Sequence, residues 1–157
     1  MKIDVEKIKE LRNKTGVSIG DCRTALEKAN GDMDKALKFL QTRGAEVAEK
    51  KAQRTIGAGV VDSYIHHTLT SGSTVVVGTE TDFVARNPEF KEFAHNVAQQ
   101  VAATGTVNIP QLLQEHWIKD ESKTIGDLVN EQIGKFGENI QIQKAQRFEV
   151  GKTKEKK

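Results

Sequence analysis

The chain has 157 residues, of which 36% are apolar and 29% are charged, and its formal net charge is +2. This length is enough for one ordinary domain or for a small module beside a core domain, and the small positive charge is not typical of a protein that binds DNA or another polyanion. Its single cysteine, Cys22, excludes an intramolecular disulfide framework and a zinc site built from several cysteines, which favours a reducing compartment.

The N-terminal segment, MKIDVEKIKEL, has the periodicity of a helix and carries acidic residues, unlike a signal or transit peptide. No apolar run approaches the ~18 residues of a membrane span, so we expect a cytoplasmic protein, or the mature form of an organellar one. Val5, Ile8 and Leu11 share one face of this first helix, and Gly16 is placed to end it.

Two further short helices are predicted before residue 45. Ser18 caps the second helix with Asp21 as its capping partner, whereas Asp32 caps the third and Gly44 marks its end. Their apolar faces consist of Cys22, Ala25, Leu26 and Ala29 in one helix and Met33, Ala36, Leu37 and Leu40 in the other. We expect residues 1–44 to form a three-helix bundle that serves as a docking module, because its core is too thin for an enzyme.

Residues 45–58, rich in alanine and charge, are expected to form a partly helical linker to a core domain over residues 59–150. Two strand-like runs, GVVDSYIHH and STVVVGTET, predict an antiparallel hairpin over residues 59–81 with a turn at Ser71-Gly72. Three consecutive valines in the second run suit a strand buried on both faces or a short central strand.

Two helices and a last strand complete the core domain. Asn87 and Pro88 are a good cap and first residue for a helix over 88–103, and a second helix is expected from Thr124 to a stop at Gly137. ENIQIQKAQRFEV then alternates as a strand, and GKTKEKK at 151–157 is expected to be a disordered tail. The fold class is therefore α+β, with helices on one face of a small antiparallel sheet.

The connection TETDFVAR, which joins the hairpin to the helix at residue 88, contains an unusual aromatic residue. Thr81 can cap a helical turn of its own within it. Spacing alone favours Phe83 as a core side chain and Asp82 as a capping residue. In the alternative, the ring of Phe83 projects outward to contact a partner.

Three stretches of the chain resemble the elongation factor Ts family, the guanine-nucleotide exchange factors of elongation factor Tu. They are IKELRNKTG with GDCRTALEKANGD near the N-terminus, TETDFVARN in the middle and GENIQIQ near the end, and together they span residues 1 to about 150 in the family's order. Ile19-Gly20 depart from a pair that is often two methionines in the family, and Gly78-Thr79 from a polar residue and cysteine. The chain has one core module, like the family's short forms, whereas long forms have two.

The resemblance implies a chain that promotes GDP release from elongation factor Tu during translation elongation. It implies that the N-terminal bundle is similar to ubiquitin-associated domains and docks on the GTPase, with Arg12 and Ile19 at contact positions. Helix spacing alone favours the alternative, in which Arg12 lies on a solvated helix face and Ile19 fills the bundle. The resemblance further implies that Thr81, Asp82 and Phe83 bind the partner, with Phe83 inserted between side chains of the GTPase and Asp82 beside it near the magnesium site. Such a protein needs no cofactor and no catalytic residue, and two short-form chains are expected to pair as a homodimer.

Two motifs that suggest other ligands are weak. His66-His67 lie in tandem on a predicted strand, so their rings are expected to point to opposite faces and not to share a metal ion. GKT at residues 151–153 lacks the glycine spacing and the strand-loop-helix order of a phosphate-binding loop, so the chain is not expected to bind nucleotide itself.

Three other functions remain as alternatives. A peptide-binding or ubiquitin-like module would account for residues 1–44 but would leave the second domain without a task. An RNA-binding protein would need more positive charge or more aromatic residues than Tyr64 on its sheet, and Lys50, Lys51 and Arg54 are interleaved with glutamates. A hydrolase would need a nucleophile and a base that converge, and no such pair can be named.

Overall fold

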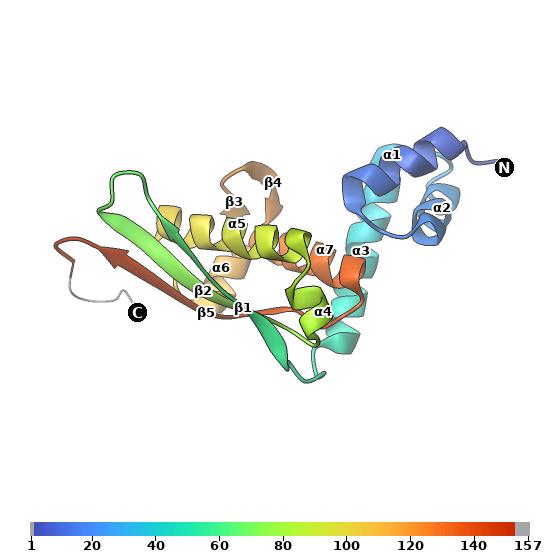
Figure 1. Ribbon diagram of the computed structural model, residues 1–157. Helices are drawn as coiled ribbons and strands as arrows, with labels where there is room; N and C mark the ends of the chain where they lie inside the picture. Colours follow the sequence, from blue (N-terminus) through green and yellow to red (C-terminus); the bar gives the residue numbers. More distant parts are fainter. Residues whose placement is uncertain (1, 153–157) are drawn as a thin grey trace.

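The computed structural model describes residues 2–152 and shows the expected α+β fold, in which three N-terminal helices precede an antiparallel sheet covered by helices (Figure 1). The N-terminal helices are α1 (Val5–Thr15), α2 (Ile19–Lys28) and α3 (Met33–Lys51). Each begins at a side chain that accepts a hydrogen bond from a backbone amide of the first turn, namely Asp4, Ser18 and Asp32. The predicted caps of α2 and α3 are confirmed.

Helix α3 does not end at Gly44, as the sequence predicts, but continues to Lys51. Gly44 is buried, and a Cβ atom added there would lie 3.3 Å from the carbonyl oxygen of Asn130 in helix α7 (Ile125–Phe136). The glycine allows the backbones of α3 and α7 to approach closely. A glycine at the end of a helical pattern usually indicates a helix end, and the local sequence does not show that α7 packs against this one. The helical part of the expected linker is therefore the second half of α3.

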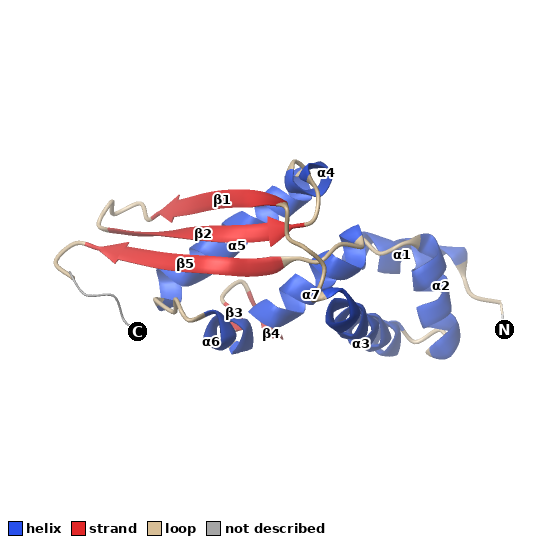
Figure 2. Cartoon of the chain, turned by 90° about the horizontal axis from the view of Figure 1, so that it is seen from below, coloured by secondary structure: helices blue, strands red, loops and turns tan. Residues whose placement is uncertain are grey.

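The sheet has the strand order β1-β2-β5, and both pairs of strands are antiparallel. Strands β1 (Ala58–Ile65) and β2 (Ser71–Thr79) form the predicted hairpin, and β5 (Gln141–Glu149) pairs with the other edge of β2. The run of three valines lies in β2, which is the central strand, as that run predicts. Helices cover one face of the sheet (Figure 2).

The hairpin turn lies earlier than expected. Ser71 and Gly72 already belong to β2, where Gly72 pairs with Ile65, and the connection is residues 66–70, with Leu69 at a φ of 61°. A Cβ atom on Gly72 would lie 2.7 Å from the carbonyl oxygen of Tyr64. This glycine is thus required by the close approach of two strands and not by a turn.

Two longer helices belong to the core domain, and both begin where the sequence predicts. Helix α5 (Pro88–Thr104) is capped by the side chain of Asn87. Helix α7 begins at a capping box formed by Thr124 and Asp127, and it ends at Gly137, whose φ of 70° is left-handed.

Between these helices the structure has three short elements that the sequence does not predict: α6 (Ile109–Gln114), β3 (His116–Trp117) and β4 (Asp120–Thr124). The buried side chain of Gln100 holds this segment against α5. Its amide nitrogen donates to the carbonyl oxygen of His116 at 3.0 Å, and its amide oxygen accepts from the backbone nitrogen of Ile118 at 2.9 Å. Elements this short give no periodic signal of their own.

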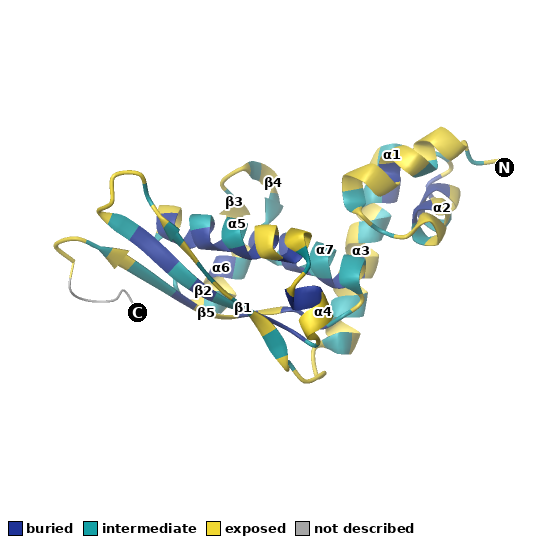
Figure 3. Ribbon diagram, in the orientation of Figure 1, coloured by how far each residue is buried: buried dark blue, intermediate teal, exposed yellow. Residues whose placement is uncertain are grey.

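The described residues have two separate hydrophobic clusters, which Figure 3 shows as dark segments of the ribbon. The small cluster lies among α1, α2 and the first half of α3 and is built on Leu11, Cys22 and Leu26. The large cluster lies between the sheet and helices α5 and α7. None of the described helices is long and apolar enough to span a membrane. Of the expected disordered tail, residues 153–157 lie outside the described part of the chain.

Candidate partner-binding surface

Phe83 lies on a short helix, α4 (Asp82–Ala85), that follows the central strand. The side-chain oxygen of Thr81 accepts a hydrogen bond from the backbone nitrogen of Val84 at 3.5 Å, which confirms Thr81 as the cap of this helix. The ring of Phe83 is 87% exposed, the highest value among the large apolar side chains of the described residues. The structure therefore excludes the interpretation of Phe83 as a core side chain.

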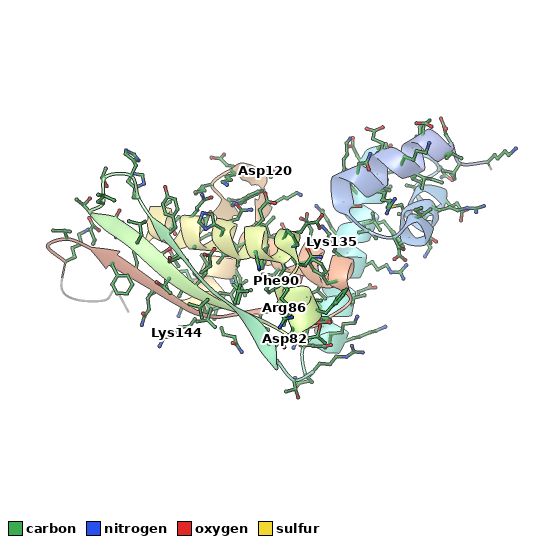
Figure 4. The ribbon with its side chains drawn as sticks, viewed as in Figure 1. Asp82, Arg86, Phe90, Asp120, Lys135 and Lys144 are labelled. Carbon is green, nitrogen blue, oxygen red and sulfur yellow. The ribbon has the colours of Figure 1, made fainter. Side chains whose placement is uncertain are left out.

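The outward direction of the ring follows from the packing of its neighbours. Val84 and Ala85 are buried, and Val84 belongs to the large hydrophobic cluster. Since successive residues of an α-helix are about 100° apart, burial of the next two residues turns Phe83 away from the core. Asp82 and Arg86, which Figure 4 labels at the two ends of α4, are also exposed.

The segment before α4 is held by a single carboxylate from a distant part of the chain. Glu138 accepts at one oxygen from the hydroxyl of Thr79 at 3.0 Å and from the backbone nitrogens of Glu80 and Thr81 at 3.1 and 3.0 Å. Its other oxygen accepts from the hydroxyl of Thr81 at 2.7 Å. Burial raises the pKa of Glu138, but the four hydrogen bonds together lower the pKa by more than burial raises it. The pKa of Glu138 therefore lies below its ordinary value.

Sequence reasoning missed this role of Glu138, because GENI reads most simply as a helix stop and a turn into a strand. One signal was present. A carboxylate directly after the C-terminal cap of a helix is unfavourable in the field of that helix, so Glu138 requires donors from elsewhere. Nothing in a single sequence, however, identifies those donors, which lie 57 to 59 residues away.

Protonation of Glu138 should weaken its hold on this segment. Because the folded pKa lies below the ordinary value of 4.5, the hydrogen bonds stabilise the fold above the unfolded pKa, and this contribution is lost as the pH falls through the folded pKa. We expect the difference in unfolding free energy between the wild-type chain and Glu138→Gln to be largest near neutral pH and to shrink below pH ~4. Urea unfolding at a series of pH values measures it, and a constant difference would contradict the assignment.

The N-terminal residues expected to contact a partner, Arg12 and Ile19, are also on the surface. Arg12 is exposed in the last turn of α1, and Ile19 is 56% exposed at the start of α2, so Ile19 does not fill the bundle. The structure does not bring these two residues into contact with Thr81, Asp82 or Phe83. The α1–α2 pair and α4 lie apart in both ribbon views (Figures 1 and 2).

Contacts between α7 and the N-terminal part help to fix the bundle beside the core domain. The side chain of Lys135 lies against Gly16, where an added Cβ atom would be 3.0 Å from its Cε atom, and its ammonium group forms an ion pair with Glu89 of α5. Burial lowers the pKa of Lys135. With α3 packed along α7, these contacts hold the bundle at two places.

The candidate RNA-binding residues serve contacts within the chain. The ammonium group of Lys51 donates to the carbonyl oxygen of Gly137 at 2.5 Å, and the guanidinium group of Arg54 lies 3.7 Å from the carboxylate of Glu80. Two of the three cations thus have structural partners, which favours the interpretation of this stretch as a structural connection.

The expectation for the histidine pair is wrong in its geometry. The rings of His66 and His67 do not point to opposite faces, because their centroids are 4.2 Å apart. The reason is that β1 ends at Ile65, so the alternation of a strand no longer applies. Within residues 2–152, no group of three or more histidine, cysteine, aspartate or glutamate side chains is placed to hold a metal ion.

Comparison with known proteins gives the chain a family. The family model described as Elongation factor TS matches residues 80–156, a range that begins just before α4. An elongation factor Ts of Thermotoga maritima is 36% identical, with 96% of this chain and 98% of the relative covered. A Synechococcus elongation factor Ts is 37% identical over 99% of this chain and 72% of the relative, and one from Clostridium botulinum is 38% identical over 96% and 49%.

These relatives differ in length, but each match includes nearly the whole of this chain. The N-terminal bundle and the core domain are therefore matched together. The class of protein is that of the translation elongation factors. The chain belongs to the elongation factor Ts family.

Proposed function

We propose that this chain binds elongation factor Tu and accelerates the release of GDP from it. The observation that carries the proposal is the exposed ring of Phe83 beside Asp82 on a short helix, whose capping residue Thr81 donates two hydrogen bonds to the carboxylate of Glu138. An aromatic side chain so exposed contributes little to folding, and large aromatic residues are frequent anchors of protein interfaces.

The proposed mechanism needs no acid, base or nucleophile in this chain. A GTPase holds its nucleotide through backbone amides of a phosphate-binding loop and through Mg²⁺, so a side chain inserted beside that loop loosens both. Phe83 is the inserted side chain, and the carboxylate of Asp82 disturbs the magnesium site. Coupling between two ligands is reciprocal, so an incoming nucleotide expels the factor by the same ratio. The chain thus acts as an exchange factor, in the cytoplasm or in an organelle, and not as an enzyme in the usual sense.

Stopped-flow release of a fluorescent GDP analogue from elongation factor Tu tests this proposal directly. We expect release to be accelerated by micromolar concentrations of the wild-type chain. Unchanged release would refute the exchange function. Recovery of RNA or a ubiquitin-like protein, in place of the nucleotide-free GTPase, in a pull-down would favour the alternative interaction modules.

Arg12 and Ile19 are proposed to dock the bundle on the GTPase. Within the described residues Arg12 makes no ion pair, whereas Arg23 of α2 pairs with Glu27 at 3.0 Å. Arg12→Ala should weaken association by about 1 kcal/mol, or about fivefold in Kd, with no loss of fold, because a charge-assisted contact at a partly exposed interface is removed. Arg23→Ala is the matched control. Titration calorimetry measures both, and equal Kd values for Arg12→Ala and the wild-type chain would refute the docking role.

We further propose that two chains pair through the uncovered face of the sheet. This face presents Val61 and Ile65 of β1 and Phe148 of β5, which are 70%, 61% and 56% exposed. Ile65, Gly72 and Phe148 lie side by side across the three strands, and the side chain of Ile65 lies over Gly72, where an added Cβ atom would be 2.8 Å from the Cδ1 atom of Ile65. A second copy packed on this face would remove these apolar side chains from water.

Light scattering tests the pairing. We expect a dimer at tens of micromolar for the wild-type chain and a monomer for Phe148→Lys, because a buried unpaired ammonium group opposes association. Ile118→Lys, which places the same charge at a 48% exposed apolar position between β3 and β4 and outside this sheet, is the control and should leave the dimer intact. A monomeric wild-type chain would contradict the proposal.

A further inference from the structure

We infer that Glu138 is a positioning residue for Phe83: its carboxylate fixes the segment from which α4 starts and thereby sets the direction of the ring. The inference rests on the proposed exchange function and extends it to a residue outside α4. Glu138 itself is largely covered and does not offer its side chain to a partner.

The hydrogen bonds of Glu138 converge on the three residues immediately before α4. Its four donors belong to Thr79, Glu80 and Thr81, and no other side chain in the described part of the chain bonds to both the backbone and the hydroxyl of Thr81. Hydrogen bonds to an ionised carboxylate are stronger than neutral ones. Since Thr81 also caps α4, an orientation imposed on Thr81 is passed directly to the helix that carries Phe83.

The same turn is fixed from its other side by the end of α3. The side-chain amide of Asn139 donates to the carbonyl oxygen of Arg54 at 2.8 Å, and the ammonium group of Lys51 bonds to Gly137. The backbone nitrogen of Asn139 in turn donates to the carboxylate of Glu80 at 3.2 Å. Residues 137–139 therefore tie the segment before α4 to the helix that begins in the bundle.

This arrangement fixes Phe83 relative to α3, and so relative to the bundle with Arg12 and Ile19. A partner that contacts both places meets them at a set separation. Pre-organisation of this kind reduces the entropy lost on binding and places the ring where the exchange reaction requires it. Loss of Glu138 should then lower exchange even though every contacting side chain is still present.

A double-mutant cycle on the full-length chain tests the inference. Glu138→Ala should lower the maximal rate of GDP release at saturating factor by about tenfold, with Glu138→Gln intermediate because its amide oxygen can still accept. In a Phe83→Ala background the same substitution should have almost no further effect, because both changes act through one ring. Additive effects would overturn the inference.

Glu115→Ala is the matched control. Its carboxylate is also partly buried and accepts hydrogen bonds from Gln100 and Thr106, but it lies in the segment after α6, away from α4. Loss of this carboxylate should lower stability and leave the maximal exchange rate of the folded protein within about twofold of the wild-type rate. A tenfold loss of rate with Glu115→Ala would show that general destabilisation explains the effect of Glu138→Ala. That result would overturn the positioning role of Glu138.

Amide hydrogen exchange gives a readout that does not need the partner. In Glu138→Ala the amides of Glu80 and Thr81 should exchange at least tenfold faster, whereas those of Val75 and Val97 in the large core should keep their protection. Uniform loss of protection would overturn the positioning role. If the wild-type chain fails to accelerate GDP release, the exchange function fails and the inference about exchange falls with it. If the wild-type chain is active and the amides of Glu80 and Thr81 keep their protection in Glu138→Ala, only the inference fails.

Discussion

Phe83→Ala is expected to reduce the acceleration of GDP release roughly thirtyfold and to leave the melting temperature nearly unchanged. Truncation of an aromatic anchor at the centre of an interface typically costs ~2 kcal/mol or more, which accounts for the size of the effect. The ring is 87% exposed, so its removal takes little apolar surface from the folded core. Stopped-flow release and thermal unfolding, measured on the same sample, check both expectations.

Phe90→Ala is the control for this experiment, because Phe90 is a core side chain. It lies seven residues further along the chain, is fully buried and contacts Phe93 and Phe136 at ring-centroid distances of 6.3 Å. Phe90→Ala should cost roughly 3 to 5 kcal/mol of stability. If Phe83→Ala behaves like Phe90→Ala in the melting experiment and the folded fraction exchanges normally, Phe83 has no role at an interface.

Gly44→Leu is expected to destabilise the chain by about 1 to 3 kcal/mol, because a side chain at this position must separate α3 from α7. Even the first carbon of that side chain would lie 3.3 Å from a backbone oxygen, which cannot move without the helix that carries it. Leucine is a good helix former, so the loss cannot come from helix propensity. Urea unfolding gives the free energy.

Gly134→Leu is the control for this substitution. Gly134 lies in α7, and an added Cβ atom there would meet nothing within 4 Å. The same change should therefore be neutral or stabilising, since glycine is a poor helix residue. Equal losses in the two variants would show that Gly44 does not mark a close contact between helices.

The sequence predicted best those elements whose signals lie within a few residues. The caps at Asn87 and Thr124 and the stop at Gly137 place α5 and α7 almost correctly, because a helix end is decided by the side chains next to it. The central strand followed from its valines in the same way. The residues that predict each of these elements lie within it or directly beside it.

The features that sequence reasoning missed depend on residues far apart in the chain. Gly44 and Gly72 resembled a helix stop and a turn residue, because the backbone that approaches each of them is not adjacent in sequence. The exposure of Phe83 could be stated only as one of two alternatives, since burial depends on the whole core. The likeness of TETDFVARN to a family motif favoured the exposed alternative, whereas spacing alone favoured the core.

Because Glu138 follows Thr81 by 57 residues in the sequence, the hydrogen bonds between them can form only late in the synthesis of the chain. Ribosomes synthesise residues 79–83 well before residue 138, and N-terminal segments begin to fold during synthesis. The carboxylate that holds Thr81 is 57 residues further on. A nascent chain that has emerged only as far as α5 thus has Phe83 but nothing to fix its direction. The direction of the ring should therefore be set only after the turn at residues 137–139 has left the exit tunnel.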